Sequence, residues 1–266
     1  MAAFDFGEKV DPRHFEKYSN SNFSVNIKEY FKKSLDIVKK HFGKFIFFNV
    51  LLSFATLLPE FVAIKYVSFA VLVVMPSFYA GYVIVAFKFL SSQSIKFSDF
   101  FKGFNYFLPL FFFSIVSIVI GLLPFIAFVL PGYNYLFFPD VFNSQFNSLL
   151  QLVVFIFLLV PVVYLGVCYM FAIAFIIDYR MGFWQAMEIS RMIISKHWAS
   201  FFGFSVCIFM LQSIGSIVCS LIFIYFGQSV IGIVAVSVPL GFVFSVPLLP
   251  VAIAYNEIIG LVSDGW

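Results

Sequence analysis

The residues that could do chemistry in this chain are few, and two histidines at matching places are the first candidates. His41 and His197 each precede an aromatic residue at the start of a long apolar stretch. A shared metal or proton site is one interpretation, but neither histidine has a Cys or carboxylate three or four residues further along, so the metal evidence is weak. Because an amphipathic ring also suits the headgroup boundary of a membrane, we predict interfacial anchoring, with no metal and no cofactor.

A second candidate is a group of charged residues in the C-terminal half. Asp178 ends an apolar stretch, Arg180 follows two residues later, and Glu188 and Arg191 lie one helical turn apart. An ionisable residue deep in a membrane suggests function, whereas hydration lowers its cost at the membrane edge, where Asp178 is expected. We therefore interpret the four residues as a polar cluster on the inner face that holds the following helix in place.

The remaining polar side chains of the apolar stretches are sparse. A transporter of ions or polar solutes normally lines its path with more of them, often beside broken helices. Three cysteines also lie in apolar stretches, in an odd number and without paired spacing, so we expect them to pack as small hydrophobic side chains. The polar residues are Asn49, Gln151, Gln212, Asn256 and Glu257, and the cysteines are Cys168, Cys207 and Cys219.

Known catalytic patterns are missing from the sequence. It contains no Gly-rich phosphate loop, no HExxH, and no Ser-His-Asp set that membrane depth would bring together. An enzyme would need Asp178, Glu188, His197 and Glu257 to converge on one cleft. We therefore predict that the chain is not an enzyme.

The amino-acid composition indicates whether the chain folds in water or in a membrane. Hydrophobic residues make up 62%, charged residues 11%, and Phe alone occurs 42 times in 266 residues. A water-soluble domain of this composition would expose too much apolar surface. We predict an all-α, polytopic membrane helical bundle, with a polar N-terminal arm over 1–23 and a single membrane domain over 24–266. A membrane-spanning helix needs ~20 apolar residues, and six stretches suffice: 44–64, 67–90, 106–130, 149–177, 200–226 and 230–258.

Basic residues orient these six expected spans. Lys65 is the only one of the 16 Lys and Arg residues outside three stretches, before residue 45, from 88 to 102 and from 180 to 196. Cytoplasmic loops retain Lys and Arg, so we predict a multi-pass protein of the cytoplasmic membrane with both termini inside. The positive charge is explained by topology and anionic lipid at the cytoplasmic face, and no nucleic-acid partner is expected.

Each basic stretch precedes a pair of expected spans, which suggests an internal repeat. At an offset of 156 residues, Ser34 matches Ser190, His41 matches His197, and Phe45 matches Phe201. The middle copy is shorter and lacks the histidine. We therefore predict three helical hairpins, each preceded by an amphipathic or interfacial helix on the cytoplasmic side.

The first of these helices is the most clearly amphipathic. Its apolar positions recur at helical spacing on one arc, which includes Leu35 and Phe42, while charged residues occupy the opposite arc. Such a helix lies among lipid headgroups. We predict that its lysines contact the membrane surface: Lys28, Lys32, Lys33, Lys39 and Lys40.

Several short motifs lie between residues 130 and 198: Leu130-Pro131-Gly132-Tyr133, Tyr164 to Ala174, Ile177-Asp178, Ala186-Met187, Ser190-Arg191 and Trp198. They resemble those of bacterial six-span membrane proteins related to the membrane domain of glycerophosphoryl diester phosphodiesterase. The resemblance covers about a quarter of the chain by motif, and it implies an integral envelope protein. The phosphodiesterase active site of that family belongs to a separate soluble domain, so the resemblance implies no activity here.

Two functional hypotheses remain from the sequence. The first is a non-enzymatic membrane scaffold that contacts lipid or a membrane-protein partner through its inner-face helices. The alternative is a small transporter or lipid-handling protein with a cavity between kinked helices. A mid-membrane cavity lined by Asn49, Gln151 or Gln212 would distinguish the two.

Overall fold

The computed structural model describes residues 10–21, 23–62, 65–126, 144–226 and 230–262, and the regular structure in these ranges is helical. The all-α prediction is therefore confirmed for them. The long helices are α3 (Phe42–Val62), α4 (Lys65–Leu90), α5 (Phe107–Leu122), α7 (Ser144–Cys168), α10 (Trp198–Phe226) and α11 (Val230–Ile258). The shorter ones are α1 (Arg13–Asn20), α2 (Ile27–Lys40), η1 (Phe97–Tyr106), η2 (Leu123–Phe125), α8 (Ala172–Asp178), α9 (Phe183–Ile194) and η3 (Ser195–His197).

Local sequence explains where the short helices start and stop. The Asn26 side chain accepts a hydrogen bond from the Glu29 backbone N–H, which caps the start of α2. Lys39 and Lys40 occupy its last turn, where positive charge suits the helix dipole. In η1, the Asp99 carboxylate accepts a bond of 2.7 Å from the Lys96 backbone N–H and caps the start of that helix.

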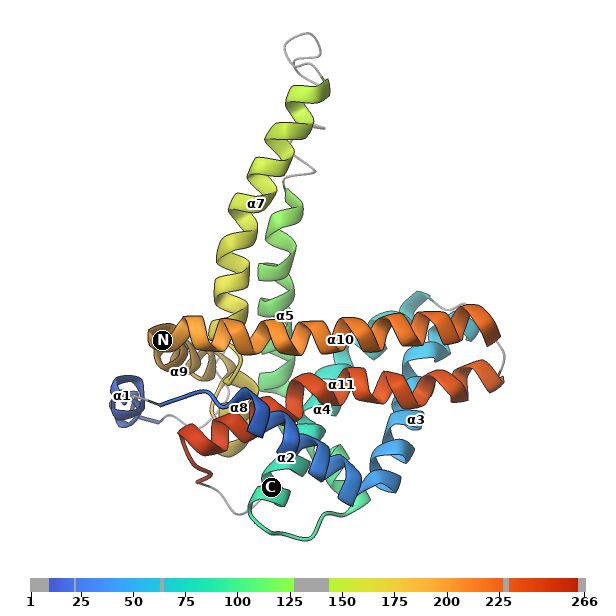
Figure 1. Cartoon of the computed structure of the whole chain (residues 1–266), viewed down its shortest axis with the longest axis horizontal. Coiled ribbons are helices and arrows are strands. Elements are labelled where there is room, and N and C mark those ends of the chain that lie inside the picture. The colour runs from blue at the N-terminus through green and yellow to red at the C-terminus, as the bar shows by residue number, and fades with distance from the viewer. Residues whose placement is uncertain (1–9, 22, 63–64, 127–143, 227–229, 263–266) are drawn as a thin grey trace.

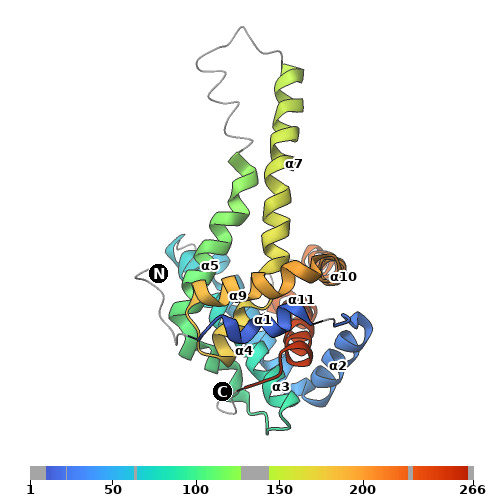
Figure 2. The same ribbon diagram turned by 90° about the vertical axis from the view of Figure 1, so that its left-hand side faces the viewer.

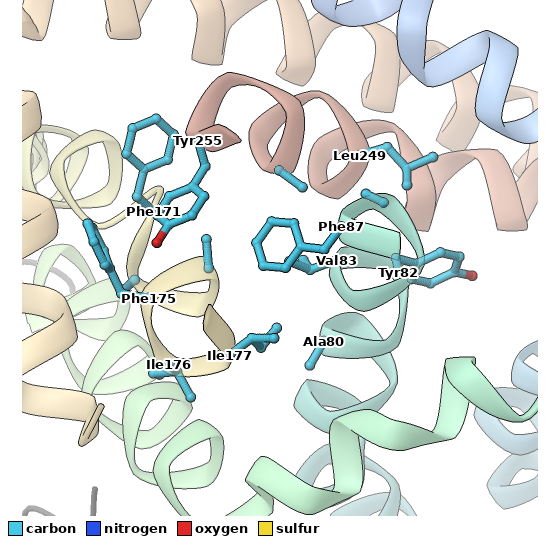
Figure 3. Close-up of a cluster of buried hydrophobic side chains, with 14 of the residues drawn as sticks. Ala80, Tyr82, Val83, Phe87, Phe171, Phe175, Ile176, Ile177, Leu249 and Tyr255 are labelled. Atoms are coloured by element: carbon cyan, nitrogen blue, oxygen red, sulfur yellow. The ribbon is translucent and has the colours of Figure 1, made fainter. Parts of the chain in front are cut away.

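The short helices other than η2 pack with the ends of the long ones into one body, which we call the base (residues 10–21, 23–49, 80–106, 168–204 and 249–262). Figure 3 shows its centre, where aromatic side chains from α4, α8 and α11 meet. The Tyr255 ring lies 5.0 Å from Phe175 and 5.6 Å from Phe87, measured between centroids, and all three side chains are fully buried. Burial of each such ring contributes on the order of 2 kcal/mol, so the base is the main packed core of the described residues.

The N-terminal segment is part of this base. Phe15 of α1 is fully buried, with its ring 5.3 Å from Phe175. The Ser19 hydroxyl donates a hydrogen bond of 3.0 Å to the Met192 carbonyl of α9. Within 10–21, the predicted polar arm is therefore a helix docked on α9.

Three long helices leave the base with their apolar side chains exposed, and we call them the arms: α5, α7 and residues 205–226 of α10. Phe157 on α7 is 76% exposed and Ile224 on α10 is 78% exposed. Figures 1 and 2 show α5 and α7 projecting from the base together. Apolar side chains at such exposure favour a lipid environment over water.

Four helical stretches in the searched part of the chain are long and apolar enough to cross a membrane: 73–90, 97–125, 149–178 and 183–226. These stretches support the prediction that the chain is a membrane protein. Five of the six expected spans coincide with helices wherever the backbone is described, and the remaining one, 149–177, is helical on both sides of a short break. However, α10 and α11 lie side by side and run across the direction of α5 and α7 (Figures 1 and 2). The pairs of long helices therefore do not share one direction in the structure.

The expected span 149–177 is interrupted. Helix α7 ends at Cys168 and α8 begins at Ala172. The Ser190 hydroxyl of α9 bridges the break. It donates a hydrogen bond of 2.6 Å to the Cys168 carbonyl and accepts one of 3.1 Å from the Phe171 N–H. A buried side chain thus satisfies backbone groups that the missing helical turn would leave unpaired.

Candidate functional site

Helix α2 presents three different surfaces around its axis. Tyr30 and Ile37 are fully buried against the rest of the base, which includes α11. Next around the helix, Leu35 is 50% exposed, and Phe42, the first residue of α3, is exposed to the same extent. The predicted apolar arc is therefore divided between Val38, which is buried in the base, and Leu35, which is half exposed.

Four of the five predicted contact lysines lie on the exposed side of α2: Lys28, Lys32, Lys39 and Lys40. At 100° per residue, Lys28, Lys32 and Lys39 follow directly after Leu35 around the helix. An exposed apolar strip therefore borders a strip of positive charge. This is the arrangement of a helix that lies at a lipid surface.

Lys33 is engaged within the protein. Its Nζ lies 2.7 Å from the Glu29 carboxylate and 3.6 Å from that of Glu257 on α11. The hydrogen bond to Glu29 raises the pKa of Lys33 above its usual value. The Tyr30 hydroxyl also donates a hydrogen bond of 3.5 Å to the Glu257 carboxylate, so these contacts join α2 to the end of α11.

The four residues of the predicted inner-face polar cluster occupy two different places. Asp178 is buried, and its carboxylate accepts a hydrogen bond of 2.9 Å from the Tyr255 hydroxyl and one of 3.2 Å from the Val262 N–H. Arg180 adopts a positive φ of 52° and lies beside Tyr106. Glu188 and Arg191 are exposed on α9 and line a depression with Tyr169, Trp184 and Met187. Asp178 therefore ties α8 to α11 and the C-terminal segment, whereas Glu188 and Arg191 face outward.

The two histidines each lie against a separate aromatic ring. The His41 ring is 6.3 Å from Phe89 and edge-on to it, and the His197 ring is 4.2 Å from Phe23. Burial, together with Lys44 and Lys40, lowers the pKa of His41. Within the described residues, no three His, Cys, Asp or Glu side chains gather where they could hold a metal ion.

The structure contains a charged group that the sequence analysis did not single out. Asp99 of η1 is 1% exposed, and its carboxylate lies 2.7 Å from Lys88 Nζ and 3.3 Å from Lys102 Nζ. Lys88 comes from the last turn of α4. A lone acidic residue three positions before a lysine, in a basic stretch after a span, was the available signal.

An apolar groove of about 500 Å³ lies where the arms meet the base. Its walls are side chains of α5, α7, α10 and α11, together with Tyr169, Met170 and Ile173 near the break. Gln212, one of the three polar residues proposed as a cavity marker, lines it. Asn49 instead accepts a hydrogen bond from the Tyr82 hydroxyl inside the base.

The residues required for an enzymatic cleft have different neighbours. Glu257 contacts Lys33, Asp178 contacts Tyr255, and His197 contacts Phe23. Glu188 lines the depression on α9. These four side chains therefore take part in four separate sets of contacts.

Comparison with known proteins found that no protein family model, curated protein or solved structure matches the chain.

Proposed function

We propose that this chain is a non-enzymatic, multi-pass protein of the cytoplasmic membrane that acts as a scaffold and contacts anionic lipid through its base. The observation that carries the proposal is the surface of α2, where half-exposed Leu35 borders the exposed strip of Lys28, Lys32 and Lys39. Phe42, at the start of α3, is exposed to the same extent. Apolar side chains enter the acyl boundary while the lysines meet lipid phosphates. The same exposed face could also receive a membrane-protein partner.

The proposed topology has six spans as three hairpins, with both termini inside. Both ends of the described chain support this arrangement, because α1 packs on α9 and the Val262 N–H bonds to Asp178 in the same base. A short helix also precedes each pair of long helices along the chain. We propose that these helices, α2, η1 and α9, are three copies of one repeated element.

Equivalent positions of the proposed repeat have similar environments. Ser34 and Ser190 are both buried, and Phe45 and Phe201 are both almost fully buried. The resemblance to the membrane domain of glycerophosphoryl diester phosphodiesterase agrees with an envelope protein of this kind. It suggests a membrane part without an enzyme, and we carry no activity over from it.

The test compares lipid-dependent stability of full-length variants in mild detergent. Adding phosphatidylglycerol should raise the unfolding temperature of the wild type more than phosphatidylcholine does, because each surface lysine contributes ~1 kcal/mol to anionic binding. The triple variant Lys28→Glu, Lys32→Glu, Lys39→Glu should lose most of this difference. A matched triple reversal at exposed Arg13, Lys17 and Lys96 should keep it.

Equal loss in both triple variants would show that net charge alone, not the α2 surface, sets the lipid response. An unchanged response in the α2 variant would contradict the proposal.

The alternative, a lipid-handling protein, is favoured by one specific observation. The groove between the arms and α11 is lined by Gln212 and otherwise almost entirely by apolar side chains. Such a lining suits an acyl chain better than an ion or a polar solute.

A further inference from the structure

We propose that the groove and the depression on α9 form one binding site for a single glycerophospholipid, with an acyl chain in the groove and the phosphate at Arg191. The inference rests on the proposed membrane location but not on the α2 surface. It assigns a ligand class and a specific site to the molecule.

The groove has the size and chemistry of a ligand site. Its volume of about 500 Å³ lies within the range of roughly 300 to 1,000 Å³ typical of small-molecule pockets. The few polar groups in its wall include Ser117, Ser205 and Gln212. The Ser117 hydroxyl donates 2.8 Å to the Phe113 carbonyl one turn back on its own helix, so that polar group is already satisfied.

The surroundings of the groove indicate where its occupant comes from. Three of its four long-helix walls, α5, α7 and α10, carry the exposed apolar side chains of the arms, such as Leu122, Val163 and Phe209. Phe209 and Val163 belong both to this exposed surface and to the groove lining. In a bilayer the groove is therefore continuous with the lipid-facing surface, and an acyl chain can enter it sideways.

The polar end of the site follows from one shared residue. Tyr169, at the break after α7, lines both the groove and the depression that holds Arg191 and Glu188. The Arg191 guanidinium can donate two parallel hydrogen bonds to a phosphate. Trp184 lines the same depression and is 53% exposed, which is typical of an aromatic ring at the headgroup level.

Two glycines allow the groove to be filled without disturbing the fold. A Cβ at Gly121 or Gly166, both in the groove lining, would meet nothing within 4 Å. Gly203 on α10 has equally free space but does not line the groove. Replacing any of the three by Leu raises helix propensity by a similar amount, so Gly203→Leu is a matched control.

The experiment measures phospholipid retained by the purified full-length protein, by native mass spectrometry, before and after titration with phosphatidylglycerol. We expect one tightly held lipid on the wild type and on Gly203→Leu. Gly166→Leu and Gly121→Leu should each weaken retention at least tenfold, because the Leu side chain occupies the acyl path. Should one of them fail to fold, the other carries the test.

The headgroup is tested separately. Arg191→Gln should weaken retention about tenfold, as expected for the loss of a charge-assisted hydrogen bond, whereas Arg13→Gln on exposed α1 should not. Glycerol 3-phosphate, which lacks acyl chains, should not displace the lipid at the same concentration.

Three outcomes overturn the proposal: full retention in both groove-filling variants, full retention in Arg191→Gln, or equal competition by glycerol 3-phosphate, which would indicate a free phosphate site. The α2 triple reversal should leave this single lipid in place. Failure of the groove site can therefore be told apart from failure of the α2 surface.

Discussion

Two glycines at the contact between α4 and η1 in the base have the opposite surroundings to two glycines of the arms. A Cβ on Gly81 of α4 would overlap the Phe100 carbonyl oxygen, and one on Gly103 of η1 would overlap that of Ser77. A Cβ on Gly121 or Gly166 in the arms would meet nothing within 4 Å. The base is therefore packed backbone against backbone where α4 meets η1, whereas the arms leave open space beside Gly121 and Gly166.

Burial follows the same division. In the candidate span 73–90, which ends in the base, 67% of the most apolar window is buried, compared with 6% to 11% for the spans that contain the arms. Stability should therefore depend on residues of the base, and lipid dependence on residues of the arms and of α2.

The largest expected effect is at the contact between α4 and η1. Gly103→Ala should destabilise the protein by about 4 kcal/mol or more, because the two backbones would have to separate. Gly203→Ala, by contrast, should stabilise it by up to about 1 kcal/mol through helix propensity. Denaturant unfolding in detergent measures both. A small effect of Gly103→Ala would contradict the close packing of the base.

Removing the buried carboxylate should have the next largest effect. Asp99→Ala leaves the side chain of Lys88, 10% exposed, without its partner, and breaking a buried pair costs about 3 kcal/mol or more. The double variant Asp99→Leu, Lys88→Met should recover most of this loss, since no charge then stays buried. The measurement compares the unfolding midpoints of the wild type, Asp99→Ala and the double variant. A further loss of stability in the double variant would rule out a coupled pair.

A smaller effect is expected at the break between α7 and α8. Ser190→Ala removes both hydrogen bonds to the freed backbone groups and should cost about 2 kcal/mol. Ser213→Ala on α10 removes only a bond to the carbonyl one turn earlier and should change stability by less than about 0.5 kcal/mol. Thermal unfolding of both variants is the measurement. Equal losses would show that Ser190 has no special role.

The smallest effect concerns pH. Because the pKa of His41 is lowered in the folded protein, the unfolded state binds the proton more tightly, and stability should fall slightly as pH drops below about 6.5. His41→Gln should remove this component of the pH dependence. Unfolding temperatures at pH 7.5 and pH 5.5 test it, and an identical pH dependence in the variant would exclude His41 as its source.

Sequence periodicity predicted the helices well but not their tertiary contacts. The expected stretch 67–90 closely matches α4, because a run of apolar residues sets both the element and its length. The break at 169–171 could not be predicted, since its residues are as apolar as their neighbours and the stabilising Ser190 comes from another helix. The burial of Asp99 likewise depends on a lysine that the preceding helix brings to it.

The candidate site, like the fold, could be predicted only in part from the sequence. The five lysines of α2 follow from its amphipathic pattern, and four of them are exposed. The half-exposure of Leu35 depends on how α11 packs against α2, which no local pattern encodes. The groove could not be predicted for the same reason, because its walls come from four helices that pack together only in the folded protein.

The central claim is that the base is packed on itself while the arms and the α2 strip contact lipid. Spin labels at positions 157, 224 and 35, in a background with all three cysteines replaced, can be compared in lipid nanodiscs for collision with oxygen and with a water-soluble nickel chelate. The account predicts oxygen-dominated collisions at 157 and 224 and balanced collisions at 35, beside the lysines. Chelate-dominated collisions at 157 and 224 would contradict it.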